Sequence, residues 1–315
     1  MKALVYSKKN FSFKEIDKPI IQSHQVLIRI VSTSLNAGDY RLVQLNSIPK
    51  SGILGNSIAG IIEEVGSDVS DVQVNDRVVC DTSDIGFGGL AEYCAVDSKL
   101  CVKVPLSMSL VDASACPVAS STALNALRLH RPIKEDEKIL IIGASGGVGT
   151  FMIQLAKYYK AHVSAVVSTQ NVDTARDCGA DIVFNYKKED INQIKSSYDR
   201  IIVVNGFYSF SFYQNHLKDN GLYIMVGGPI KQFIKNMILN PLYSLGNRKF
   251  SILNSKSNVN DLEEIIQLIS NKKIKPVIEK IYSFDQAIDA YQEFEKGHSK
   301  GKIVIQISNE LKQKS

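Results

Sequence analysis

The chain has 315 residues, of which 44% are hydrophobic and 22% charged, and its formal net charge is +5. This length is more than one core usually supports, so we expect two domains, and the composition excludes disorder, collagen and coiled coil as the main architecture. Basic and acidic residues are interleaved, so we expect no nucleic-acid partner. No apolar run approaches the roughly 20 residues that span a bilayer, and the start lacks a secretory signal, so we expect a cytoplasmic protein without a membrane partner.

The cysteines give no sign of a metal site. Five are scattered along the chain without a C-x-x-C pair: Cys80, Cys94, Cys101, Cys116 and Cys178. The histidines do not cluster with cysteines or carboxylates either, whereas structural zinc sites use compact ligand pairs. We therefore interpret the cysteines as buried, reduced thiols and expect no bound metal.

The first third of the chain has the pattern of β-strands. Short β-branched or alternating segments at residues 25–31, 58–65 and 76–80 are separated by Gly, Pro, Asn and Asp. The residue pattern then changes to that of an Ala- and Leu-rich helix at residues 118–129, which Pro132 ends.

Residues 138–226 alternate between apolar strands and amphipathic helices, which predicts a parallel, doubly wound α/β sheet. The predicted strands are residues 139–142, 162–167, 182–184, 201–204 and 222–226, and a sixth strand at 250–253 and a helix at 261–270 extend the fold. A strand at 277–281 and a helix at 285–294 come next. The last strand, 302–307, is expected to return to the first domain, and the tail after Ser308 is expected to fray.

A glycine-rich turn joins the first strand of this alternation to the following helix. Its residues are Gly143, Ala144, Ser145, Gly146, Gly147, Val148 and Gly149. Small residues between a strand and a helix let the backbone approach a pyrophosphate, whose charge faces the N–H groups of the helix N-terminus. The alternative is a plain tight turn, because the spacing is G-x-x-G-x-x-G and not G-x-G-x-x-G.

The end of the second strand indicates which nicotinamide cofactor is bound. Folds that prefer NAD place an Asp or Glu there, which would repel the 2′-phosphate of NADP. Between Gly143 and Val172 this chain has no acidic residue. The candidate contacts to the ribose end are Ser168, Thr169 and Asn171, so we expect NADPH as the cofactor.

Together with the N-terminal half, these residues resemble the medium-chain dehydrogenase/reductase superfamily, and within it the zinc-free quinone oxidoreductase branch. The matching motifs, besides the glycine-rich turn, are Leu35-Asn36-Ala37-Gly38-Asp39-Tyr40, Leu54-Gly55-Asn56-Ser57-Ile58-Ala59-Gly60, Gly88-Gly89-Leu90-Ala91-Glu92-Tyr93, Ser121-Thr122-Ala123-Leu124-Asn125, Gly179-Ala180-Asp181 and Gly301-Lys302-Ile303-Val304. The resemblance implies a GroES-like β-barrel catalytic domain, residues 1–118 and 274–315, and a Rossmann NADP-binding domain, residues 119–273.

The resemblance also implies roles for single residues. Thr122 would lie near the nicotinamide, and Gly227 and Gly228 would line the dinucleotide. Tyr186 would lie near the 2′-phosphate, where Lys187 and Lys188 would supply positive charge. Asn36 and Tyr40 would face the acceptor. The structural alternatives are a capping or buried helix hydroxyl for Thr122, a turn residue for Asn36 and a packed ring for Tyr40.

Zinc-dependent relatives have Cys where Asn36 stands and Gly-His-Glu where Gly55-Asn56-Ser57 stands, and without such ligands a tetrahedral zinc is not expected. The resulting expectation is an NADPH-dependent enzyme that transfers a hydride to a quinone or a related α,β-unsaturated carbonyl compound. A non-catalytic NADPH-binding sensor or scaffold protein is the alternative. We also expect a homodimer, because the strand near Phe250 should lie at the edge of the sheet and pair with its copy.

Overall fold

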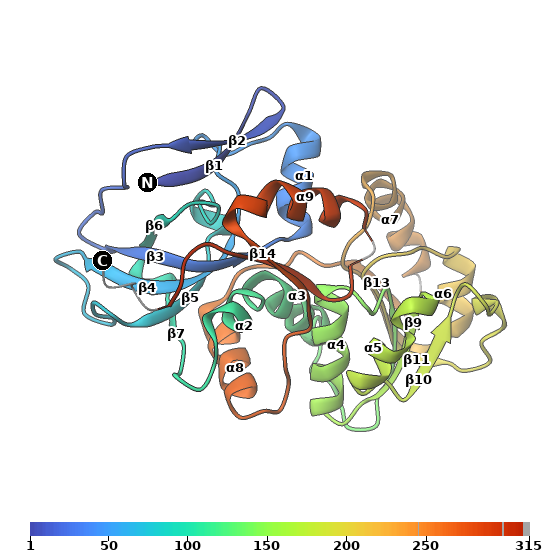
Figure 1. The fold of residues 1–315 in the computed structure, drawn as a ribbon. Coiled ribbons are helices and arrows are strands. Elements are labelled where there is room, and N and C mark those ends of the chain that lie inside the picture. Colours follow the sequence, from blue (N-terminus) through green and yellow to red (C-terminus); the bar gives the residue numbers. More distant parts are fainter. Residues whose placement is uncertain (245, 298, 311–315) are drawn as a thin grey trace. The chain divides into compact units, whose positions relative to one another are not determined.

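The computed structural model describes residues 1–244, 246–297 and 299–310, and Figure 1 shows its fold. The chain divides into two compact units, residues 1–121 with 257–315, and residues 122–256. The sequence prediction grouped residues 257–273 with the second unit. In the structure they belong to the first, because α8 (Val259–Ser270) contacts β7 and Ser270 Oγ lies 3.2 Å from Ser107 Oγ.

The first unit is built on a mainly antiparallel sheet. Within the described residues its strand order is β14-β15-β3-β4-β5-β7, with β6 also paired to β3, and β1 and β2 form a separate hairpin. The strands are β1 (Lys2–Ser7), β2 (Asn10–Glu15), β3 (Gln25–Ser34), β4 (Ser57–Val65), β5 (Arg77–Asp81), β6 (Tyr93–Asp97), β7 (Val102–Lys103), β14 (Ile278–Ser283) and β15 (Lys302–Gln306). The helices are α1 (Ala37–Leu45), α2 (Leu110–Ser114), the first part of α3 (Pro117–Arg128), α8 and α9 (Ala287–Glu295).

The C-terminal strand returns to the first unit, as predicted, because β15 pairs antiparallel with β3. The prediction of a frayed tail after Ser308 is wrong for its first residues. Ser308 Oγ donates to the carbonyl of Ile30, and the Glu310 carboxylate accepts hydrogen bonds from Arg77 and from the backbone N–H of Leu110. Residues 311–315 lie outside the described part of the chain.

The second unit contains a parallel sheet with the strand order β10-β9-β8-β11-β12-β13 over the described residues. This order, third-second-first-fourth-fifth-sixth along the chain, is that of the doubly wound dinucleotide-binding fold and confirms the predicted fold class. The strands are β8 (Lys138–Ile142), β9 (His162–Val167), β10 (Ile182–Asn185), β11 (Tyr198–Val203), β12 (Leu217–Met225) and β13 (Lys249–Ile252). The helices are the rest of α3, α4 (Gly147–Tyr158), α5 (Val172–Asp177), α6 (Phe210–His216) and α7 (Ile230–Tyr243).

Burial explains why the strands of this sheet have continuous apolar sequences. The β8 residues from Ile139 to Ile142 are all buried, because a parallel sheet is covered on both faces. Met152, Leu155 and Ala156 of α4 are buried at the spacing of one helix face, and α4 contacts β8 and β9.

Helix α7 was not predicted from the sequence, because amides lie on its buried side and large apolar side chains on its exposed side. Its residues Asn236 and Asn240 are buried, whereas five of its large apolar side chains are more than half exposed: Ile230, Ile234, Met237, Ile238 and Leu242. Asn236 is held inside by a hydrogen bond from the Tyr223 hydroxyl to its Oδ1, 2.9 Å long.

No helix in the described ranges is both long and apolar enough to cross a membrane.

Candidate active site

The glycine-rich turn after β8 has the shape that a dinucleotide requires. Gly143 adopts φ +78°, and a Cβ there would lie 2.5 Å from the Asn205 carbonyl oxygen, while a Cβ on Gly149 would lie 2.5 Å from the Ala144 carbonyl carbon. At Gly146, which caps the N-terminus of α4, a Cβ would meet no atom within 4 Å. The turn is thus tightly packed on the protein side and open in front of the helix N-terminus, where a pyrophosphate would bind.

The predicted ribose contacts surround the ends of β9 and β10. Asn171 is buried, its Nδ2 donates to Ser145 Oγ over 2.8 Å, and within the described residues its Oδ1 has no hydrogen-bond partner. An unpaired buried oxygen next to the glycine-rich turn is a place where a ligand hydroxyl can donate. The hydrogen bond from Asn171 to Ser145 therefore connects the segment after the second strand to the glycine-rich turn.

The remaining predicted ribose contacts come from neighbouring parallel strands. Val167 lies beside Asn185 in the β9–β10 register, so Ser168 and Tyr186 follow adjacent strand ends. Thr169 Oγ1 lies 3.2 Å from Asn185 Oδ1. Tyr186 is 43% exposed, and Lys187 Nζ lies 5.4 Å from the centre of its ring. The Lys187 ammonium and the hydroxyls of Ser168, Thr169 and Tyr186 thus follow the ends of β9 and β10.

The predicted residues Gly227 and Gly228 follow β12, next to the loop that ends β11. Sequence reasoning missed two residues of that loop, Asn205 and Phe207. Asn205 packs on Gly143, and the Phe207 ring would overlap any Cβ at Gly228. The turn dipeptide Asn205-Gly206 after a predicted strand was the available signal, since parallel strand ends gather at one edge of the sheet.

In the first unit, Asn36 is buried and its side chain is fully hydrogen-bonded. Its Nδ2 donates to the Ser34 carbonyl over 3.1 Å, to Asn56 Oδ1 over 2.8 Å and to Ser57 Oγ over 3.0 Å. Its Oδ1 accepts from the Lys302 ammonium. Both sides of the amide are therefore fixed, and Asn36 is held in one orientation.

Two buried charged residues, Lys302 and Asp39, are hydrogen-bonded to Asn36. Neither was predicted from the sequence to position Asn36. Asp39 accepts from the backbone N–H groups of Asn36 and Gly55, at 3.0 and 2.9 Å. Burial raises the pKa of Asp39 to about 6, against the lowering effect of these hydrogen bonds and of Lys302. Burial likewise lowers the pKa of Lys302 to about 8.

The other two predicted catalytic residues are partly exposed. The Tyr40 hydroxyl donates to Glu295 Oε1 over 3.2 Å, and desolvation and then this carboxylate raise the pKa of Tyr40, so the phenol is protonated at neutral pH. Thr122 lies on α3, and its Oγ1 is 3.3 Å from Ser255 Oγ. Asn36 and Tyr40 belong to the first unit, and Thr122 and the predicted cofactor contacts belong to the second.

The positions that carry zinc ligands in the zinc-dependent relatives do converge here, but with other chemistry. Asn36, Asn56 and Ser57 are hydrogen-bonded to one another as a neutral amide and hydroxyl cluster. Over the residues that the structure describes, no three His, Cys, Asp or Glu side chains gather into a group that could hold a metal. The donor set at this point does not fit a zinc ion.

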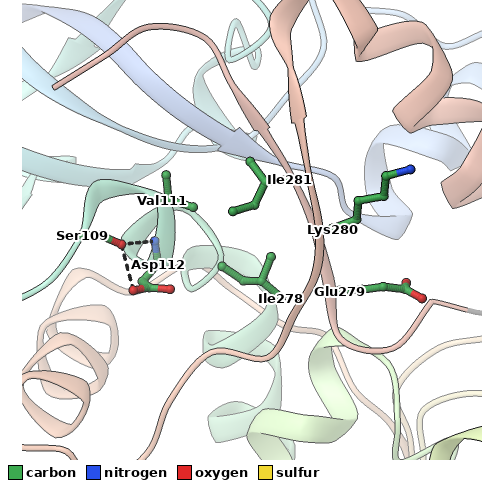
Figure 2. Close-up of a pocket in the computed structure, with 7 residues that line it drawn as sticks. All are labelled: Ser109, Val111, Asp112, Ile278, Glu279, Lys280 and Ile281. Atoms are coloured by element: carbon green, nitrogen blue, oxygen red, sulfur yellow. Dashed lines mark hydrogen bonds between the residues drawn. The ribbon is translucent and has the colours of Figure 1, made fainter.

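A surface pocket of the first unit, shown in Figure 2, is separate from these groups. It is lined by Ser109, Val111, Asp112, Ile278, Glu279, Lys280 and Ile281. The Ser109 hydroxyl accepts from the Asp112 backbone N–H and donates to the Asp112 carboxylate, so these polar groups cap α2 (Figure 2). We assign this pocket no function.

Two family models match the chain. Residues 22–106 match the alcohol dehydrogenase GroES-like domain, and residues 178–305 match the zinc-binding dehydrogenase family. The two matches fall in the β-rich N-terminal segment and in the part of the chain that runs from the nucleotide-binding fold to the returning strand.

Similar proteins cover nearly the whole chain. The chloroplast envelope quinone oxidoreductase homolog of Arabidopsis thaliana is 31% identical over 93% of this chain and 92% of its own length. The chloroplastic NADPH-dependent alkenal/one oxidoreductase of the same plant is 29% identical over 91% of this chain and 73% of its own length. The structure of the quinone oxidoreductase from Coxiella burnetii superposes with a TM-score of 0.87, at 27% identity and with 98% and 99% of the two chains covered.

Proposed function

This chain is an oxidoreductase that belongs to the quinone oxidoreductase-like branch of the medium-chain dehydrogenase/reductase superfamily, and we propose that it transfers a hydride from NADPH to a quinone or a related α,β-unsaturated carbonyl compound without zinc. The observation that carries the proposal is the glycine-rich turn. Its packing against Asn205 and the open space at Gly146 fit a dinucleotide pyrophosphate. Bound NADPH would supply the hydride, and the protein would supply position and hydrogen bonds.

The preference for NADPH over NADH rests on charge at the end of β9. No carboxylate stands between Gly143 and Val172 to repel a 2′-phosphate, and Lys187 lies against the Tyr186 ring. Ser168 and Tyr186 are hydroxyl donors on adjacent strand ends. The name of the Arabidopsis alkenal/one oxidoreductase, a relative that covers 91% of this chain, includes the same cofactor.

Asn36 and Tyr40, both in the first unit, would act on the acceptor, and their hydrogen bonds favour different roles. Both amide hydrogens of Asn36 already have acceptors, so Asn36 would present a fixed dipole. The Tyr40 hydroxyl, whose partner Glu295 is a surface side chain, would turn to donate to the oxygen that gains charge as the hydride arrives. Thr122 would contact the nicotinamide.

Electrostatics support a reaction without zinc. The Lys302 ammonium contacts Asn36 directly, so a divalent cation bound by Asn36, Asn56 and Ser57 would be repelled at close range in a poorly screened interior. Amide and hydroxyl oxygens are in addition weaker zinc ligands than thiolate or imidazole. These three positions are therefore proposed to serve as a hydrogen-bonding cluster.

The proposal is tested by turnover and by binding, measured separately. NADPH oxidation with a panel of quinones, enones and alkenals should proceed, and Tyr40→Phe should lower kcat more than it changes the affinity for NADPH. NADPH should bind more tightly than NADH, and the difference should shrink as salt is added. Binding of NADPH without turnover on any acceptor would favour the alternative, a non-catalytic NADPH-binding sensor or scaffold protein.

We also propose a homodimer formed through β13, which lies at the edge of the sheet as predicted. Leu253 N–H donates to the Met225 carbonyl, so the alternating pattern points the N–H of Ile252 to the open edge. The exposed apolar face of α7, a helix that contacts β13, offers further area for a partner. The cytoplasm remains the proposed compartment, because scattered cysteines without a C-x-x-C pair are typical of reduced thiols.

A further inference from the structure

Two cysteines that the proposed reaction does not use lie opposite each other, Cys80 on β5 and Cys101 directly before β7. In the antiparallel pairing of β5 with β7, Val78 is opposite Lys103 and Val79 is opposite Val102. One step further along this register places Cys80 opposite Cys101. Their sulfur atoms are 3.5 Å apart, and both residues belong to one apolar cluster.

The backbone geometry at this pair suits a disulfide. The N–H of Val104 donates to the carbonyl of Arg77, so the pairs 77–104 and 79–102 occupy hydrogen-bonded positions and the pair 80–101 a non-hydrogen-bonded one. Opposed Cα atoms at such positions are about 4.5 Å apart, inside the range of about 4.4–6.8 Å that disulfides span. Rotation of the two side chains can therefore close the gap between the sulfur atoms without moving a strand.

The two thiols differ in access, which sets the order in which they would react. Cys101 is partly exposed, whereas Cys80 is fully buried, and burial raises the pKa of Cys80 well above its usual range. An oxidant from solvent would therefore meet Cys101 first, and Cys80 would act second, on a sulfur already in contact with it.

We propose that Cys80 and Cys101 are a modification site that a hydroperoxide, with hydrogen peroxide as the simplest case, converts to a disulfide. The Cys101 thiolate attacks one peroxide oxygen, the O–O bond breaks, and a sulfenic acid forms while the other oxygen leaves as water. Cys80 sulfur then attacks the Cys101 sulfur, the S–O bond breaks, and the hydroxyl leaves as a second water with the Cys80 proton. Two thiols are oxidised and one peroxide is reduced to two waters.

The position of this pair connects it to the cluster around Asn36. Cys80 directly precedes Asp81, whose carboxylate accepts from the backbone N–H of Ser83 over 2.9 Å. Ser83 Oγ accepts from Asn56 Nδ2 over 2.9 Å, and Asn56 Oδ1 accepts from Asn36. Cys80 is thus on β5, the strand that leads into this cluster, although the proposal itself does not depend on the proposed activity.

The test is the thiol content and the disulfide map of the full chain after treatment with hydrogen peroxide. Wild type should lose two of its five thiols, with the loss of two hydrogen masses, and should regain them with dithiothreitol. Cleavage after Arg77, Glu92, Lys99 and Lys103 separates Cys80, Cys94 and Cys101 into different peptides, so the expected cross-link between the first and the last can be distinguished from one to Cys94.

Matched variants complete the experiment. Cys94→Ala, which removes the third cysteine of the same cluster, should still form the cross-link. Cys80→Ala should instead accumulate a sulfenic acid on Cys101 that dimedone traps, and Cys101→Ala should retain its four remaining thiols; circular dichroism would confirm that each variant is folded. A wild type that keeps five thiols, that cross-links Cys94, or that proceeds to sulfinic acid on Cys101 without a cross-link would overturn the proposal.

Discussion

Replacing Lys302 with methionine should change how the stability of the protein depends on pH. Lys302 is 4% exposed, and its ammonium donates to the carbonyl of Leu35 over 2.8 Å and to Asn36 Oδ1. Burial lowers its pKa from 10.5 to about 8, and the negative charge of Asp39 offsets only part of this effect. The folded chain therefore releases the Lys302 proton at a lower pH than the unfolded chain does.

The difference in the pKa of Lys302 between the folded and the unfolded chain determines the sign and the size of the change in stability with pH. Between about pH 8 and 10.5 the unfolded chain holds a proton that the folded chain has lost, so the free energy of unfolding rises with pH in this window. Below pH 8 both states are protonated and the cost of burying the charge is present in full. About two and a half pH units at ~1.36 kcal/mol each correspond to about 3 kcal/mol over the window.

Urea unfolding at about pH 7.5 and about pH 10.5, followed by circular dichroism, measures this contribution. The free energy of unfolding of wild type relative to Lys302→Met should rise by about 3 kcal/mol between the two conditions. Methionine keeps the length of the side chain and removes its charge. Lys14→Met, at an exposed position of β2, is the control and should show no such rise. A difference that is flat or falls with pH would show that the Lys302 ammonium is not held in a desolvated site.

Three further predictions concern stability, metal content and assembly. Glu137→Gln should lower the free energy of unfolding by about 3–5 kcal/mol in urea titrations, because it leaves the buried Arg200 guanidinium without the carboxylate 2.7 Å from its Nε. The control, Glu135→Gln at an exposed ion pair, should cost less than about 1 kcal/mol. Turnover should survive chelators, and elemental analysis that finds one zinc per chain, with loss of activity on its removal, would contradict the proposed chemistry. Sedimentation at micromolar concentration should show a dimer, and Ile252→Pro should yield monomers because it deletes an N–H at the open edge, while Ile252→Val should not; a monomeric wild type would refute the interface.

The second unit was predictable because local patterns determine it. Continuous apolar runs such as residues 139–142 occur where both faces of a strand are buried, and α4 shows its buried face through helical spacing. Once strands and helices alternate, right-handed crossovers leave few topologies. The strand order was therefore accessible from a single sequence.

Helix α7 shows where such reasoning fails. Periodicity assigns the apolar positions Ile234 and Ile238 to the core, yet both are more than half exposed, and the buried positions are Asn236 and Asn240. The helix is held by particular hydrogen bonds, such as the one from Tyr223, and by a few apolar contacts to the sheet. The hydrophobicity pattern of a sequence does not show which residue hydrogen-bonds a buried amide. It also does not show which surface packs against an exposed apolar face.

The resemblance indicated positions that the fold brings together, but not the hydrogen bonds that hold their side chains. Asn36, Asn56 and Ser57 could be aligned by resemblance, but the cation that fixes Asn36 comes from position 302, which no local pattern connects to it. The same three positions serve zinc relatives and this chain because the fold brings them together, and the side chains then decide the chemistry. With carboxylate or thiolate ligands there, a metal would offset their negative charge. With neutral amides and a hydroxyl, the buried ammonium of Lys302 takes the place of that positive charge, with Asp39 as its counterion. A neutral donor cluster and a buried Lys302–Asp39 pair are therefore consistent with each other, and replacing Lys302 alone should leave the buried Asp39 carboxylate without its counterion.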